Sequence, residues 1–84
     1  MHLYISLKMQ HDINILSVQV DENTAFANFA NQNLNGGTLE ETLFISQVVK
    51  TLMEFPQVKK VKFLIEGETA ETLMGHIDIS KPLE

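Results

Sequence analysis

Apolar and polar residues alternate along the first part of the chain in the pattern typical of β-strands. Residues 3–9 carry an apolar side chain at every second position, and residues 13–20 and 24–30 repeat this alternation after short polar breaks. A period of two is expected where one face of a strand is buried and the other meets solvent. We therefore predict three strands, the last two joined as an antiparallel hairpin across a three-residue turn at 21–23.

The middle of the chain carries a helical pattern. Thr38 and Glu41 match a capping box, in which a threonine hydroxyl and a glutamate carboxylate accept hydrogen bonds from backbone amides of the first turn. Apolar residues then share an arc about 180° wide; they are Phe44, Ile45, Val48, Val49, Leu52 and Met53. Phe55 and Pro56 end the pattern, because proline has no amide hydrogen and disfavours helical geometry in the residue before it. These features predict a helix over 39–54.

The last third of the chain returns to extended patterns. Residues 58–66 alternate as a strand and end at a turn around Gly67, residues 69–73 predict a further short edge strand, and residues 75–80 form an extended tail before Pro82. The order of elements predicts an α+β fold, a small mixed β-sheet of three to five strands with one main α-helix on one face. The strands on either side of the helix are expected to be parallel.

A single helix covers only one face of such a sheet, so apolar residues on the second face need an explanation. The residues that alternation assigns to this face are Ile15, Phe26, Leu64 and Tyr4. Leu39 and Leu43 also fall on the otherwise polar side of the helix. A contiguous apolar patch usually marks an interface. We treat Ile15, Phe26 and Leu64 as a candidate interface, with coverage by the C-terminal tail as the alternative.

Composition narrows the classes of partner. The chain has 84 residues, enough for one domain (1–84), and a net charge of −5; its six basic residues are all lysines. The absence of arginine and the acidic balance disfavour nucleic acid and anionic membranes as partners. The absence of cysteine excludes disulfides and thiolate metal sites. No apolar run approaches the ~20 residues of a membrane-spanning helix. Leu83 and Glu84 are interpreted as a vector-derived tail.

The residue types of a hydrolytic triad occur at His76, Asp78 and Ser80, two positions apart in an extended segment. Their Cα atoms would be about 6.6 Å apart, too far for the ~2.6–3.2 Å contacts that activate a nucleophile. The histidines also lack the helical spacing of a two-histidine metal site. We therefore expect no catalytic residue, metal or cofactor, with His76 donating a hydrogen bond in a turn and Asp78 capping amides. The alternative is a small ligand-binding or hydrolytic domain that uses His76 and Asp78.

Several ordered motifs resemble the GerMN domain family over about residues 13–82. They are the helix start G-T-L-E-E (37–41), the helix end T-L-x-x-F-P (51–56), the strand leading to Gly67, and the closing T-L-M-G-H-I-D-I-S-K-P (72–82). The closing motif contains Gly75, His76, Asp78, Ser80 and Pro82. Members of this family commonly carry a strand and a helix ahead of the hairpin, where this chain has only residues 1–12. This departure fits a shortened member, a truncated chain, or a domain that completes its sheet with another copy.

The resemblance implies a fold similar to ring-building motifs and a place in extracytoplasmic, membrane-anchored bacterial lipoproteins linked to sporulation and germination. It implies no catalytic residues, and it makes Gly75, His76 and Asp78 a structural lock. We therefore expect a non-enzymatic protein–protein interaction module of the cell envelope. Its partners would be proteins or further copies of itself, with membrane contact only through an anchor that these residues do not contain.

Overall fold

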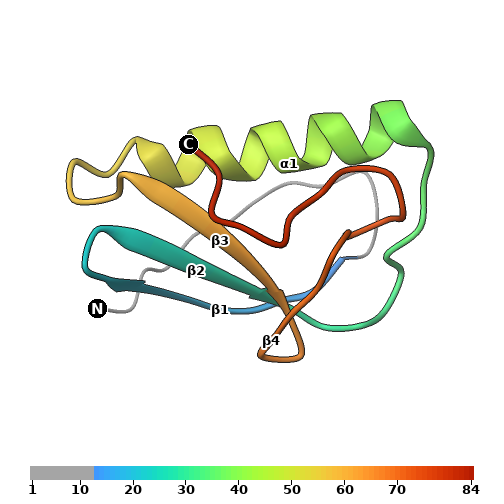
Figure 1. Ribbon diagram of the computed structural model, residues 1–84, viewed down its shortest axis with the longest axis horizontal. Coiled ribbons are helices and arrows are strands. Elements are labelled where there is room, and N and C mark those ends of the chain that lie inside the picture. The colour runs from blue at the N-terminus through green and yellow to red at the C-terminus, as the bar shows by residue number, and fades with distance from the viewer. Residues whose placement is uncertain (1–12) are drawn as a thin grey trace.

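The computed structural model describes residues 13–84, so the strand predicted at 3–9 lies outside the described residues. The elements are β1 (Ile15–Asp21), β2 (Thr24–Phe29), α1 (Thr38–Met53), β3 (Lys60–Ile65) and β4 (Glu68–Thr69). The sheet has the order β1-β2-β3-β4, and α1 lies across one of its faces (Figure 1). The predicted α+β fold, with a small mixed sheet and one main helix, is confirmed.

β1 and β2 form the predicted antiparallel hairpin, but its turn is shorter than expected. Asp21 still pairs with Thr24, which leaves only Glu22 and Asn23 in the turn. Both residues have positive φ, 48° and 70°. These are the φ signs of a type I′ turn, whose twist matches that of the flanking strands. The prediction of a three-residue turn is therefore wrong by one residue.

The start of β1 contains an irregularity that changes which side chains face the core. Ile15 pairs with Phe29 but Ser17 pairs with Asn28, so the register shifts between them. Ile15 packs against the core, and the side chain of Leu16 is 51% exposed. The prediction that Ile15 points to the second face is wrong, because an extra residue in one strand reverses the alternation beyond it.

The core lies between α1 and the sheet. β2 and β3 are parallel, as predicted for strands on either side of a helix. Phe29 on β2 stacks on Phe63 of β3, with ring centroids 5.7 Å apart, and meets the edge of Phe44 of α1 at 5.5 Å. Phe29 and Phe63 are fully buried. The predicted apolar face of α1 is confirmed, since Phe44, Ile45, Val48 and Leu52 are all buried. No helix within residues 13–84 has the length and apolar content needed to cross a membrane.

After β3 the chain turns through Glu66 and Gly67, which have φ of 52° and 79°, into β4. β4 has only two residues, so the edge strand predicted at 69–73 is shorter and begins one residue earlier. The chain then continues as an irregular segment, residues 70–83, which we call the strap (red in Figure 1). Leu83, set aside in the sequence analysis, pairs with Val61 of β3 through two backbone hydrogen bonds of 2.7 and 2.8 Å.

Candidate functional site

The first turn of α1 carries two adjacent glutamates with different roles. Gly37 is the N-cap residue, and its amide donates to Oε1 of Glu40 at 2.9 Å. Thr38 lies one position further along, inside the helix, where its carbonyl accepts a hydrogen bond from Oγ1 of Thr42 at 2.8 Å. The capping box predicted from Thr38 and Glu41 is therefore wrong by one residue. Because Glu40 accepts from the N-cap amide, Glu41 is available for other contacts.

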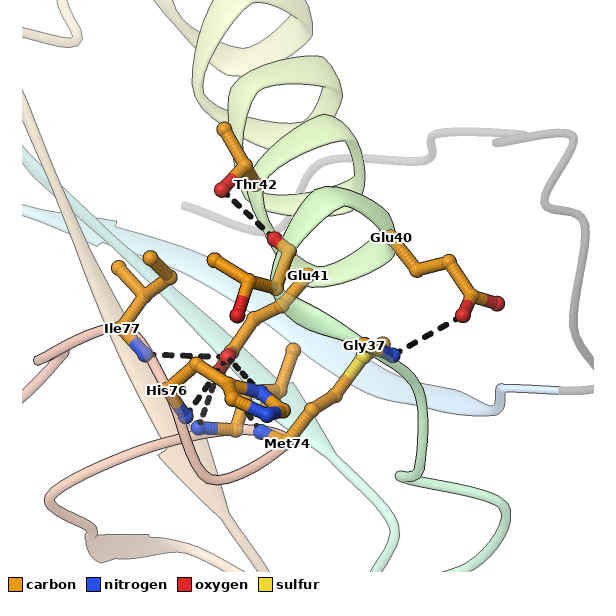
Figure 2. Close-up of polar contacts among 9 residues, drawn as sticks. Gly37, Glu40, Glu41, Thr42, Met74, His76 and Ile77 are labelled. Atoms are coloured by element: carbon orange, nitrogen blue, oxygen red, sulfur yellow. Dashed lines mark hydrogen bonds and ion pairs between the residues drawn. The ribbon is translucent and has the colours of Figure 1, made fainter.

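Glu41 points from α1 toward the strap and is completely buried. Successive helical residues are rotated by about 100°, which places Glu41 on the same face as the buried Phe44 and Ile45. Its Oε2 accepts hydrogen bonds from the amides of Leu73 (3.2 Å) and Met74 (2.7 Å). Its Oε1 accepts from the amides of His76 (2.9 Å) and Ile77 (3.0 Å), as Figure 2 shows. A carboxylate is costly to bury unless it is paired and hydrogen-bonded, and these four amides meet that need.

His76 and Gly75 complete this arrangement. Nδ1 of His76 lies 3.1 Å from Oε1 of Glu41 (Figure 2). The side chain of His76 is 37% exposed. Gly75 has a φ of 101°, a value that residues with a Cβ rarely adopt. This turn lets the amides on both sides of Gly75 converge on one carboxylate, the geometry of a backbone nest for an anion.

Asp78 and Ser80 form a second local contact within the strap. Oδ1 of Asp78 accepts hydrogen bonds from the amide of Ser80 at 2.8 Å and from its hydroxyl at 2.6 Å. These two hydrogen bonds hold the pKa of Asp78 below its usual value. The expected capping of an amide by Asp78 is therefore seen. Nζ of Lys62 on β3 donates to the carbonyl of Ser80 at 2.7 Å, which attaches this part of the strap to the sheet.

An open hollow of about 280 Å³ lies on the strap. The side chains that line it are Glu71, Thr72, His76, Asp78 and Ser80. The hollow thus contains the three residue types of a triad, but the Ser80 hydroxyl donates to Asp78 and the His76 ring faces Glu41. A serine–histidine relay needs the hydroxyl to contact the imidazole. Within residues 13–84 no group of three or more histidines, aspartates or glutamates is placed to hold a metal ion.

The remaining motif residues shape chain ends and turns. Phe55 closes the end of α1, where its amide donates to the carbonyl of Leu52 at 3.2 Å and Pro56 follows outside the helix. The amide of Gly67 donates to the side chain of Asn28 at 2.7 Å, which ties the β3–β4 turn to β2. Pro82 directly precedes the residue that pairs with β3.

The candidate interface divides into two parts. Phe26 and Leu64 are half-buried and lie on the sheet face opposite the residues packed against α1, because their neighbours Ala25, Ala27 and Phe63 face the core. Ile15 does not share this face. The role of Phe26 and Leu64 as an interface stays a prediction.

The outer side of α1 exposes a leucine pair, which we define as Leu39 and Leu43. The two side chains are 71% and 53% exposed. They are four residues apart and so occupy adjacent turns of one helix face. Their predicted position on the polar side of the helix is confirmed.

Sequence reasoning missed the role of Glu41, although the sequence contains a signal for it. Glu41 precedes Phe44, Ile45 and Val48 at spacings of three, four and seven, the spacing of the buried stripe itself. A charged residue in register with such a stripe needs a buried partner. Here that partner is formed by backbone amides 32–36 residues later in the chain.

Comparisons with known proteins agree with this architecture. The family model described as Germane, sporulation and spore germination, matches residues 6–71. The first GerMN domain of the sporulation protein GerM from Bacillus subtilis is similar in structure, with a TM-score of 0.73, 31% identity, and coverage of 87% of this chain and 56% of that one. The tandem GerMN domains of the same protein match with a TM-score of 0.74 and 29% identity over 87% of this chain and 26% of that one.

A proposed lipoprotein from Clostridium perfringens is also similar, with a TM-score of 0.78 and 25% identity over 84% of this chain and 48% of that one. The chain therefore spans about half or less of the length of these solved relatives. No curated protein matches it. The family match covers most of the chain, and the solved GerMN domains share its helix and mixed sheet, so the chain belongs to the Germane family of sporulation and spore-germination domains, a GerMN domain.

Proposed function

We propose that this domain is a non-enzymatic protein–protein interaction module of the bacterial cell envelope, acting in sporulation or germination. The observation that carries the proposal is the leucine pair of α1, 71% and 53% exposed on a helix whose opposite side is well packed. Large exposed apolar side chains close together favour an interface over isolated solvent exposure.

The polar residues support the same proposal. The side chains that could do chemistry, His76, Asp78 and Ser80, are engaged in hydrogen bonds that shape the strap. A buried Glu41 likewise serves the strap and is closed off from solvent. Among residues 13–84, the leucine pair of α1 is an apolar feature that the packing of the fold does not use.

The placement in the envelope rests on relatives. One solved relative is a proposed lipoprotein, and another is a sporulation protein with two such domains in tandem. Domains of this fold thus occur beside one another within one chain. We therefore take a second domain of the same kind as the partner, with the leucine pair as the contact.

The test is the absolute mass of the protein in solution by light scattering over a wide concentration range. We expect the wild type to associate with rising concentration and the double variant Leu39→Ser/Leu43→Ser to stay monomeric. Leu16→Ser removes a leucine of similar exposure from β1 and serves as the matched control. A wild type that is monomeric at every concentration would exclude self-association, and a double variant that associates as the wild type does would exclude the leucine pair.

Phe26→Asp/Leu64→Asp tests the sheet face in the same experiment. If this variant alone loses association, the interface lies on the sheet and not on α1.

The hollow beside His76 and Asp78 favours one second candidate, a site for a small polar ligand. A screen of metal ions and small polar metabolites by NMR shift perturbation would test it, with His76→Ala as the control. Binding that disappears in a folded His76→Ala protein would support this candidate.

A further inference from the structure

The strap holds Glu41 in the way that an anion receptor holds its ligand. Four of the five amides of residues 73–77 donate to one carboxylate, at 2.7–3.2 Å. The Nδ1 atom of His76 lies 3.1 Å from the same group. All of these donors belong to one continuous segment, so the receptor is formed by the strap and the ligand by α1.

The carboxylate held by this receptor is completely shielded from solvent. Glu41 has no exposed surface, and no buried side-chain nitrogen or oxygen within residues 13–84 lacks a hydrogen-bond partner. Leu73 and Met74, whose amides donate to Oε2, are themselves buried. Removal of the carboxylate would therefore leave the buried amides of Leu73 and Met74 without an acceptor, which is unfavourable.

From this geometry we infer that residues 73–77 form a carboxylate-binding nest whose resident ligand is the side chain of Glu41, and that the strap docks on α1 only when the nest is filled. The ligand class is a carboxylate anion, because the two oxygens of one carboxylate each accept from two amides. A free carboxylate such as formate would then replace the missing side chain in a Glu41→Ala protein.

The experiment titrates Glu41→Ala with sodium formate and follows the unfolding equilibrium and the amide resonances. We expect formate at ten times its dissociation constant to lower the unfolding equilibrium constant about 11-fold, the value given by linkage for one site. The amide resonances of Leu73, Met74, His76 and Ile77 should move together during the titration. Sodium chloride at equal ionic strength should have no such effect.

Glu40→Ala is the matched control, since it removes the adjacent carboxylate, which contacts the Gly37 amide and not the strap. Formate should leave the stability of Glu40→Ala and of the wild type unchanged. Equal stabilisation of all three proteins, or a formate effect without movement of the four amide resonances, would overturn the inference.

If Glu41→Ala is unfolded without formate, the same titration measures refolding by circular dichroism. If Glu41→Ala does not refold at any formate concentration, the inference is tested instead with Glu41→Gln, by measuring hydrogen exchange. Glutamine keeps the shape of the side chain but places an NH₂ group against two backbone donors. We expect the four strap amides to exchange at least tenfold faster in Glu41→Gln while the β2–β3 amides keep their rates. Unchanged strap exchange in a folded Glu41→Gln protein would overturn the inference.

Discussion

The helix-on-sheet core and the strap occupy neighbouring parts of one small domain, but different forces hold them. In the core, Phe29 and Phe63 are fully buried and stack on each other, and regular secondary structure satisfies their backbone. The strap has almost no regular secondary structure, and a buried carboxylate, a lysine and one short bridge, between Val61 and Leu83, attach it to the helix and the sheet. A segment without helix or strand can therefore be held in place by side-chain hydrogen-bond acceptors instead of a backbone ladder.

The largest effect is expected for Phe63→Ala. This substitution removes a fully buried ring that stacks on Phe29, which costs about 3–5 kcal/mol. A domain of 84 residues is stable by about 4–13 kcal/mol at ~0.05–0.15 kcal/mol per residue. Urea denaturation should therefore show a large loss, with core and strap losing hydrogen-exchange protection together. If the strap amides of Phe63→Ala keep their hydrogen-exchange protection while the core amides lose theirs, the strap does not depend on the core and this prediction is wrong.

Gly75→Ala should weaken the strap while the core stays intact. A Cβ at this position would meet no atom within 4 Å, so the cost comes from the backbone φ of 101° alone. Left-handed geometry costs an alanine about 1–2 kcal/mol. Hydrogen exchange should rise at residues 73–77 before it rises in β2 and β3. Gly67→Ala has a positive φ and equally open space, so it is the matched control outside the strap.

Glu40→Ala should have a smaller effect, confined to the start of α1. It removes the acceptor of the Gly37 amide, and one such hydrogen bond contributes about 0.5–1.5 kcal/mol. The change in the free energy of unfolding can be compared directly with that of Glu41→Ala. If the two adjacent substitutions cost the same, the special position of Glu41 would be contradicted.

The smallest effect is expected for Asp78→Ala, and it should depend on pH. Hydrogen bonds from Ser80 lower the pKa of Asp78 below its usual value of 3.8, so the folded state favours the ionised form. The stabilisation by this group is present above pH 3.8 and is lost as the pH falls through the lower folded-state pKa. The stability difference between the wild type and Asp78→Ala should therefore shrink in acid. A difference that grows in acid would contradict this assignment.

Hydrophobic periodicity predicted the helix, the hairpin and the parallel strand, because these elements bury one face and repeat it over several turns or pleats. Hydrophobic periodicity could not predict the bulge that turns Leu16 outward. Apolar and polar residues still alternate on both sides of the extra residue, and only the face to which each side chain points is exchanged.

The site was harder to predict for a related reason. The sequence offers one capping box, Thr38 with Glu41, and Gly37 lacks the side chain that would mark it as the N-cap residue. In the structure Gly37 is nonetheless the N-cap residue and Glu40 accepts its amide, which leaves Glu41 buried against the strap. The strap itself has no period, so its path depends on contacts that lie 32–36 residues away.

The separation of 32–36 residues between Glu41 and the strap amides also affects the order in which parts of the chain fold. The β1–β2 hairpin closes across two residues and can form within about 1–10 µs, the usual time for a hairpin. The strap must wait for α1 to present Glu41 and for β3 to present Val61 and Lys62, its anchor points on the sheet. Closing a longer loop also costs more chain entropy. Among residues 13–84, we therefore expect the strap to dock after the hairpin, α1 and β3 have formed.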